Sequence, residues 1–548
     1  MRLLPFALWA MLALAGSRAA PGQTLSDSVR DRLRDRVAQE PAALRRLYEG
    51  RDSYPAWSGN EGLSPRASAV AALIHHAASE GLPPQEYAVP ALRFQLDPDS
   101  LADLDVRLSR AVLAYAADLA TGRVDPAAID TDWSAAAGRS EATRAVAEGL
   151  DSWRLPSLLE SLAPPYPAYG RLRLALAHYR NIAALGGWPA VPGGAVLIPG
   201  DTGAGVPALR TRLAVDGDLR TRAGTPGARY DSALEQAVRR FQMRHGLEAD
   251  GHVGPSTLTA LNVPVEARIR QIEVNLERWR WLPREPGDRY IMVNTAAAEL
   301  QVVEAGRAAL AMRVIVGRRD WPTPLVSARG AGLLFGPAWY VPRAIAVQEI
   351  LPAVRRNPEY LARERIQVFP DSGGTVEVDP AAIDWSQVTD STFAFQLRRE
   401  PGATNPLGGV KLVAPNRFEV YIHDTPARAL FRERVRTFSH GCVRVERAAD
   451  LATYLLGNET RWPGDSVRAA MAQSRERWVP LPSSVLVLLA YWTAWADDDG
   501  TVQFRDDVYG WDTRLAEALA RPRAERRRFP RPMPMKITAA SSAGSRNP

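Results

Sequence analysis

Cysteine is nearly absent from this chain of 548 residues, where Cys442 is the single one. One cysteine excludes an internal disulfide, and it excludes metal sites that are built from paired cysteines. Lysine is almost as scarce, because Lys411 and Lys536 are the only two, so arginine carries nearly all of the positive charge. The formal net charge of +7 is small for this length and does not predict a nucleic-acid-binding protein.

Long hydrophobic runs are also few. The chain starts with the positive Arg2, residues 3–15 carry no charge, and the small residues Ser17 and Ala19 follow. This order is typical of a secretory signal, which we expect over residues 1–20. The apolar run is shorter than the ~20 residues that cross a bilayer, and an uncleaved anchor is the alternative. We therefore expect a periplasmic protein with no other transmembrane span.

Export makes the lone thiol unusual, because oxidising compartments favour paired cysteines. An unpaired cysteine in such a compartment is either buried and inert or kept for its reactivity. The composition alone leaves both interpretations of Cys442 open.

The remaining composition is that of a globular protein, with 46% hydrophobic and 24% charged residues. Residues 21–190 show the spacing of amphipathic helices and predict a helical scaffold domain. One clear series runs through Leu101, Leu104, Leu108 and Val112. A break rich in proline and glycine follows at residues 189–205.

Residues 191–265 predict a small unit with its own core. Apolar residues recur at helical spacing, at Val206, Leu209 and Leu213 and again at Leu234, Val238 and Phe241. Phrases such as Asp250-Gly251 and Gly254-Pro255-Ser256-Thr257 stand between them. The unit resembles the three-helix peptidoglycan-binding module that is found beside cell-wall enzymes.

From residue 266 to 525 the sequence predicts a β-rich domain. The apolar period becomes two in Tyr290–Asn294, Leu300–Val303 and Met312–Val316, and Glu304–Arg307 predicts a hairpin turn. Residues 343–365 return to helical spacing and predict a helical capping insertion over residues 343–393.

Further elements are expected towards the end of the chain. We predict a strand at Phe418–His423, a helix at Ala448–Leu456, and a terminal hairpin from Val485–Leu489 and Val502–Phe504. Residues 526–548 predict a disordered tail. The expected fold class is therefore an α+β multidomain protein.

The chemistry is concentrated around Cys442. Side chains alternate along a strand, so Ile422 would face the core while Tyr421 and His423 project into a cleft. An imidazole beside a thiol assists its deprotonation, and Gly441 permits tight backbone geometry in front of the nucleophile. These are the parts of a Cys–His acyl-transfer site. The alternative is a thiol buried in a core strand.

These residues resemble the signature of the L,D-transpeptidases, cell-wall enzymes with a β-rich catalytic domain. The signature has a histidine at a strand end, then Ser-His-Gly-Cys, one further residue and an arginine. This chain has His423, then Ser439-His440-Gly441-Cys442 and Arg444. Other stretches resemble the large branch of the family, which has a helical scaffold, a peptidoglycan-binding module and a capped catalytic domain. They are Asn275–Trp281, Gly317, Thr323-Pro324, Pro337–Arg343 and Asn405–Gly408.

The resemblance implies roles for individual residues. Cys442 would be the nucleophile, His423 the general acid and base, and backbone N–H groups near Gly441 and Cys442 the oxyanion donors. His440 competes for the base role by its nearness in sequence, but the resemblance assigns that role to His423. Substrate contacts are expected from Tyr421, Ser439, His440, Arg444, Asn405 and Lys411.

The implied activity is acyl transfer in peptidoglycan biosynthesis and cell-wall biogenesis, with consequences for cell shape. Cys442 would take the diaminopimelate acyl group from a tetrapeptide stem and pass it to an amine, without cofactor or metal. The partners would be stem peptides and glycan, with an outer-membrane lipoprotein as an alternative acceptor and a carbapenem as an inhibitor. Hydrolysis of the same thioester, as in an L,D-carboxypeptidase, and an inactive wall-binding protein are the alternatives.

Overall fold

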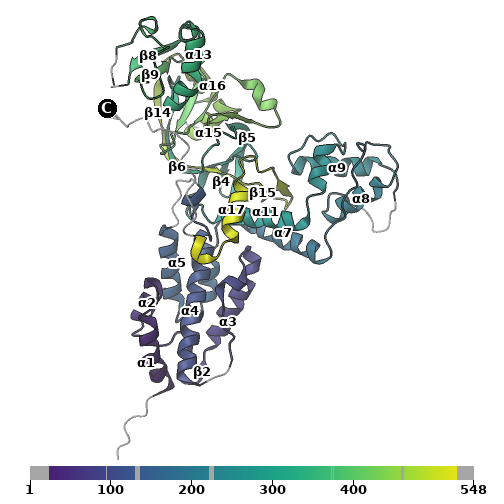
Figure 1. Ribbon diagram of the computed structural model, residues 1–548, viewed down its shortest axis with the longest axis vertical. Coiled ribbons are helices and arrows are strands. Elements are labelled where there is room, and N and C mark those ends of the chain that lie inside the picture. The colour runs from purple at the N-terminus through teal and green to yellow at the C-terminus, as the bar shows by residue number, and fades with distance from the viewer. Residues whose placement is uncertain are drawn as a thin grey trace, which may run out of the picture. The chain divides into compact units, whose positions relative to one another are not determined.

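The computed structural model describes residues 24–93, 96–129, 136–220, 227–371, 373, 376–457 and 462–526 (Figure 1). The expected signal and nearly all of the expected C-terminal tail lie outside these residues. The chain forms two compact units, the first from Met1–His76, Pro84–Ala116 and Thr143–Leu159, the second from Ala77–Pro83, Ala117–Ala142 and Glu160–Pro548. Within the described ranges, none of the helices combines the length and the apolar character that crossing a bilayer requires.

The first unit is helical, as the sequence predicts. Its elements are α1 (Leu25–Val37), α2 (Ala42–Glu49), β1 (Ser58–Gly59), β2 (Gly62–Leu63), α3 (Pro65–His75), η2 (Pro84–Tyr87), most of α4 (Pro98–Thr121), and parts of α5 (Ala136–Gly149) and α6 (Leu155–Glu160). Asp105 is its buried polar centre, accepting hydrogen bonds from the N–H groups of Ala56 (2.8 Å) and Trp57 (3.0 Å) and from the Tyr48 hydroxyl (2.5 Å). Burial raises the pKa of Asp105 to about 6.

The second unit contains the small three-helix module that the sequence predicts. Its helices are α8 (Gly205–Val215), α9 (Ser232–Arg244) and α10 (Pro255–Leu261). The expected apolar residues form one buried cluster, including Val206, Leu213, Phe241 and Leu261. The chain then continues into α11 (Val265–Trp279), which packs with α7 (Pro167–Ala184) in a different cluster.

A nine-stranded sheet closes on itself in the part of the second unit that begins at Arg289. The strand order is β12-β5-β13-β11-β10-β6-β14-β3-β4, and β4 also pairs with β5. The strands are β3 (Arg289–Asn294), β4 (Glu299–Glu304), β5 (Arg307–Gly317), β6 (Val326–Phe335), β10 (Val410–Val413), β11 (Ile422–His423), β12 (Thr437–Ser439), β13 (Val443–Val445) and β14 (Arg477–Ala490). Alternate side chains fill one core together with α15 (Ala448–Leu456) and α16 (Gly464–Met471).

The sheet confirms most of the expected strands and corrects two. The strand predicted over Phe418–His423 is only Ile422–His423, because Glu419 takes a left-handed backbone conformation with φ of 53°. The predicted terminal hairpin is wrong. Val485–Leu489 belongs to the long β14 in the sheet, and the hairpin is formed by β15 (Ala494–Ala496) and β16 (Val502–Phe504).

Helices cover the outer face of β3 and β14. The cluster there combines α7 and α11 with α17 (Trp511–Ala520). The last described helix, α18 (Arg523–Arg526), follows, and Arg523 forms an ion pair with Asp118 at 2.7 Å. Arg123 donates to the Leu519 carbonyl at 3.2 Å, so residues near 120 contact the end of the described chain.

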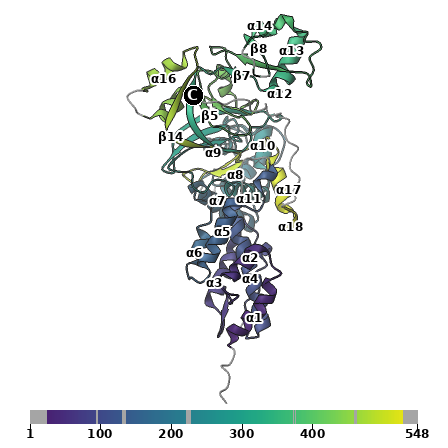
Figure 2. The same cartoon turned by 90° about the vertical axis from the view of Figure 1, so that its left-hand side faces the viewer.

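The insertion has a core of its own. The sequence predicted a helical insertion, but the segment also contains strands. It contains α12 (Arg343–Ile345), η4 (Ala346–Ile350), α13 (Leu351–Arg356), α14 (Tyr360–Arg363), η5 (Pro380–Ala382) and the sheet of β7 (Trp339–Tyr340), β9 (Phe395–Arg399) and β8 (Ile366–Pro370). Figure 2 shows α12, α13, α14, β7 and β8 gathered together. Ladder hydrogen bonds join residues far apart in sequence there, and helical periodicity does not reveal such pairing.

Candidate active site

Two short parallel strands fix the position of the expected catalytic residues. In β11 and β13, Ile422 pairs with Val443 and His423 pairs with Arg444. Ile422 and Val443 are buried in the sheet core, so His423 and Arg444 lie on the opposite face. Cys442 directly precedes β13, and the N–H of Val443 donates to the Tyr421 carbonyl at 2.8 Å.

A cavity of about 90 Å³ lies on that face. Its lining includes six of the expected site residues besides Gly441, namely Cys442, His423, Tyr421, Ser439, His440 and Arg444. Apolar residues from the insertion and its flanks complete the wall, including Trp321, Pro322, Trp339, Pro342 and Ile345. The thiol and the imidazole therefore share one cavity with a cation beside them.

Lys411 approaches the same residues from the neighbouring strand. It lies opposite His423 in the register of β10 and β11. Its Nζ lies 4.5 Å from the centre of the Tyr421 ring. Burial lowers the pKa of Lys411, while nearby Glu476 and Cys442 act in the opposite direction.

Asn405 does not reach the cavity, contrary to the expected substrate contact. It is 1% exposed, and its amide donates to the carbonyls of Pro337 (3.1 Å) and Glu400 (3.0 Å). Its Oδ1 accepts from the N–H of Leu407 at 2.8 Å. Asn405 thus shapes the loop whose next residues, Pro406 and Leu407, line the cavity.

The loop before the cysteine is held by Ser439. Its hydroxyl donates to the Cys442 carbonyl at 2.5 Å and accepts from the Gly441 N–H at 3.2 Å. Gly441 has φ of 105°, a backbone conformation that would be strained for a residue with a side chain. Ser439 was expected to contact substrate, but its hydroxyl is engaged within the loop. The Gly441 N–H was expected to be an oxyanion donor, but it already has an acceptor.

His423 is a neutral imidazole in this setting. Its Nδ1 is 2.6 Å from the Asp424 carbonyl, which accepts only, so Nδ1 carries the proton and Nε2 is left as the acceptor. Burial, followed by the charge of Arg444, lowers the pKa of His423 to about 3, although the carbonyls of Asp424 and Leu407 oppose this shift.

Cys442 is a half-buried thiol with cations beside it. Burial raises its pKa, and the backbone of Tyr421 and the charges of Arg444 and Lys411 act the other way. The Nε of Arg444 is buried and has no hydrogen-bond partner among the described residues. The cavity therefore combines an un-ionised thiol, a neutral base and two cations.

His440 is tied to the insertion, which the sequence did not indicate. Its Nε2 lies 2.7 Å from Glu349 Oε1, and Arg318 contacts the same carboxylate at 3.0 Å. The ring of Trp321 meets the His440 ring edge-on at 5.1 Å. The alternation of residues on β11 could find His423, but no local pattern could find Glu349, because its contact depends on how the insertion folds.

No group of three or more His, Cys, Asp or Glu side chains in the described ranges is arranged to hold a metal ion.

Comparisons with known proteins agree with this geometry. Residues 288–468 match the family model of the "L,D-transpeptidase catalytic domain", which includes β11, Cys442 and β13. The chain carries an L,D-transpeptidase catalytic domain. Residues 202–261 match a "Putative peptidoglycan binding domain", and residues 42–176 match a "Scaffold domain". These matches and the fold confirm the predicted fold class, whereas the domain boundaries at 190, 265 and 525 stay a prediction.

One curated relative is a "Putative L,D-transpeptidase" from Haemophilus influenzae, 31% identical over 274 residues. The match covers 49% of this chain and 54% of the relative, so the chain spans about half the length of the curated relative.

Two solved structures are also similar to the chain. One is an L,D-transpeptidase from Xylanimonas cellulosilytica, with 19% identity and coverage of 54% of this chain and 98% of that one. The other is a fused Zn-dependent amidase/peptidase/peptidoglycan-binding protein from Clostridium acetobutylicum, with 14% identity and coverage of 54% and 100%. Both have a TM-score of 0.17, which supports no argument about the arrangement of this chain.

Proposed function

We propose that this L,D-transpeptidase domain forms peptidoglycan cross-links by cysteine acyl transfer. The supporting observation is that Cys442 and a neutral His423 line one cavity with Arg444 and Lys411 beside them. Peptidoglycan as the substrate is supported by the two matched domains. The chain would act outside the cytoplasm, in the periplasm, after export by residues 1–20.

In the first step, Nε2 of His423 takes the thiol proton while Cys442 Sγ attacks the diaminopimelate carbonyl of a tetrapeptide stem. The thiol is un-ionised at rest, so proton transfer accompanies attack. The amide bond to the terminal D-alanine breaks, and the leaving amine receives the proton from His423. A thioester joins Cys442 to the stem.

In the second step, an amine of another stem attacks the thioester and gives a proton to His423. The carbon–sulfur bond breaks, a new amide bond forms between third-position residues, and Cys442 regains its proton. Since the Gly441 N–H is engaged by Ser439, we assign the backbone oxyanion donor to the N–H of Cys442.

Arg444 and Lys411 would determine which stem peptide binds as the acyl donor. Arg444 has a buried Nε without a partner among the described residues, and Lys411 stands over Tyr421. A carboxylate of the stem would satisfy both groups and would be desolvated together with them. This favours an anionic stem peptide in the cavity and leaves the sugar outside it.

The test is incubation with a defined disaccharide–tetrapeptide, followed by mass spectrometry of the products. Wild type should give a cross-linked dimer, and Cys442→Ala should give none while keeping the thermal transition of the wild type. A tripeptide as the sole product would instead make the enzyme an L,D-carboxypeptidase. Cross-linking by Cys442→Ala would refute the nucleophile, and an inert wild type would fit a wall-binding protein.

A further inference from the structure

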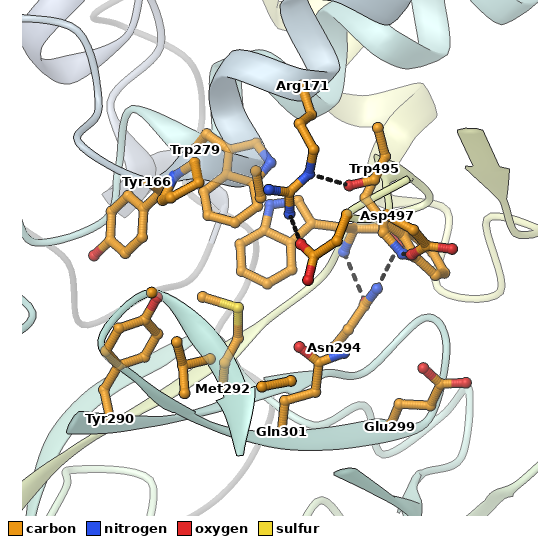
Figure 3. A pocket seen from close by; sticks show the side chains of 18 of the residues that line it. Tyr166, Arg171, Trp279, Tyr290, Met292, Asn294, Glu299, Gln301, Trp495 and Asp497 are labelled. Carbon is orange, nitrogen blue, oxygen red and sulfur yellow. Dashed lines mark hydrogen bonds and ion pairs between the residues drawn. The ribbon is translucent and has the colours of Figure 1, made fainter. Parts of the chain in front are cut away.

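A second, larger cavity of about 460 Å³ lies on the outer face of β3 and β4 (Figure 3). Its floor consists of three cross-strand pairs: Tyr290 with Val303, Met292 with Gln301, and Asn294 with Glu299. The intervening side chains of both strands fill the sheet core, so these six side chains point away from it. The size is within the usual range of small-molecule sites.

The walls are aromatic and rigid. Tyr166 directly precedes α7, and Trp279 is the last residue of its neighbour α11. Trp492 and Trp495 come from the chain around β15. The rings of Trp279 and Trp492 stack at 4.3 Å with an interplanar angle of 15°, and both residues are 2% exposed. In Figure 3, Tyr166, Trp279 and Tyr290 lie across the cavity from Trp495, Asp497 and Glu299. The site is therefore formed before any ligand arrives.

Most charged groups around the cavity have a partner nearby. At the rim, Arg171 pairs with Asp498 at 2.9 Å. Asp497 accepts from Trp495 Nε1 at 3.0 Å and from Gln503 Nε2 at 2.7 Å. Burial raises the pKa of Glu299, and the nearby cations Arg505 and Arg436 act in the opposite direction.

The groups that are left over are neutral. The indole N–H groups of Trp279 and Trp492 are buried without a hydrogen-bond partner among the described residues. The side-chain amide of Gln301, which lines the cavity, has no hydrogen-bond partner among the described residues. The two indole nitrogens are shielded from the cavity, whereas the Gln301 amide lines it, so a ligand that offers a neutral acceptor and donor can pair with that amide.

We propose that this cavity binds a short segment of N-acetylated glycan. Sugar C–H faces pack against aromatic side chains, while hydroxyl and acetamido groups can pair with the Gln301 amide. The lining carries four carboxylates and one guanidinium, Arg171, which disfavours the anionic stem peptide. The choice of N-acetylated sugar rests on the proposed function, since it makes the cavity a holding site for the glycan of the same polymer.

The experiment is calorimetric titration of the full chain with N,N′-diacetylchitobiose and with its trisaccharide homologue. Gln301→Leu removes the amide at nearly constant volume, and Ala308→Phe fills the rim from β5 without changing the walls. Both variants should weaken binding by about tenfold or more. Gln387→Leu, an exposed glutamine in the insertion, is the control and should bind as wild type does.

Absence of sugar binding by wild type overturns the proposal. Unchanged binding in both cavity variants also overturns it and moves the sugar to another site, such as residues 202–261. Binding of a sugar-free stem tetrapeptide that both variants abolish would make the occupant a peptide and would overturn it as well. Because the titration needs no catalysis, Cys442→Ala should bind sugar normally, and a failure of the proposed reaction is seen separately.

Discussion

At the residue scale, the environment of His423 separates it from the other histidine of the cavity. His423 has its Nδ1 bound to the Asp424 carbonyl, so its second nitrogen can accept a proton. His440 instead has its Nε2 beside the Glu349 carboxylate. The two rings lie in one cavity, but the second is held by the insertion through its Nε2.

The two histidines should therefore differ in kinetics. We expect His423→Ala to lower kcat by about 10²–10⁴-fold, the usual contribution of a general base. His440→Ala should lower kcat far less, because its contact with Glu349 holds the loop and takes no part in the proton transfer of the reaction. Steady-state rates on the same muropeptide give the comparison, and the reverse order would exchange the two roles.

The low pKa of His423 predicts an unusual pH dependence. A base with a pKa of about 3 stays neutral as pH falls from 7 to 5, so kcat/KM should not decline through pH 6.5. The direct check is the chemical shift of the His423 ring protons, assigned by their loss in His423→Gln. The shift should be constant from pH 7 to pH 5, and a midpoint near 6.5 would contradict the buried, neutral ring.

Much of this site was predictable because short-range rules govern it. The alternation of side chains places His423 opposite Ile422, and the glycine at 441 signals a backbone that turns sharply. The engagement of Asn405 and Ser439 was not predictable. Their hydrogen bonds go to backbone groups whose positions only the folded loops define.

At the scale of elements, the insertion is linked to the catalytic loop through one carboxylate. Glu349 in η4 contacts both His440 and Arg318. Burial acts to raise its pKa, but the hydrogen bonds with these two side chains outweigh burial and lower it. The pair is only partly buried, so its strength is modest, but it connects two separately folded parts.

Removal of that charge should loosen the insertion. In Glu349→Gln we expect faster amide exchange in peptides from Arg343 to Arg356, with the sheet strands unchanged. Hydrogen–deuterium exchange measured by mass spectrometry reports this difference. Glu359→Gln, in an exposed position of the same insertion, is the matched control and should exchange like wild type. Equal exchange in the two variants would show that Glu349 does not restrain the insertion.

The elements of the sheet illustrate where sequence patterns fail. Strands β3, β4 and β5 alternate clearly and were predicted, since each has one face in the core. The segment Val485–Leu489 is apolar on both faces because β14 lies between the sheet core and the helices α7 and α11. Such a run has no period, and its partners β6 and β3 could not be read from it.

At the scale of the whole molecule, a buried charge network stabilises the second unit. Glu277 and Arg280 are each 1% exposed at the side chain and lie 3.0 Å apart. Glu277 also accepts from the N–H groups of Arg123 and Val124, and Arg280 donates to Tyr169 at 3.1 Å. The network connects segments that are more than a hundred residues apart.

Glu277→Ala should destabilise the second unit strongly. Breaking a buried pair leaves an unpaired charge and costs about 3–5 kcal/mol. The apparent melting temperature of the full chain should fall by several degrees in differential scanning calorimetry. Glu273→Ala, one turn earlier on α11, removes a half-exposed pair with Arg180 and should have a much smaller effect. Equal losses would show that burial of the pair is not what matters.

The contact of residues near 120 with the last described helix has a consequence for biosynthesis. Asp118 forms an ion pair with Arg523, and Arg123 donates to the Leu519 carbonyl. About four hundred residues of sequence separate the partners of each contact. A ribosome produces a chain from its N-terminus. The native partners of these early residues therefore do not exist until the rest of the chain has been made. Contacts of such long sequence separation slow folding. The second unit therefore completes its fold only after synthesis has passed Arg523, which makes the interval before that point the period when chaperones matter most.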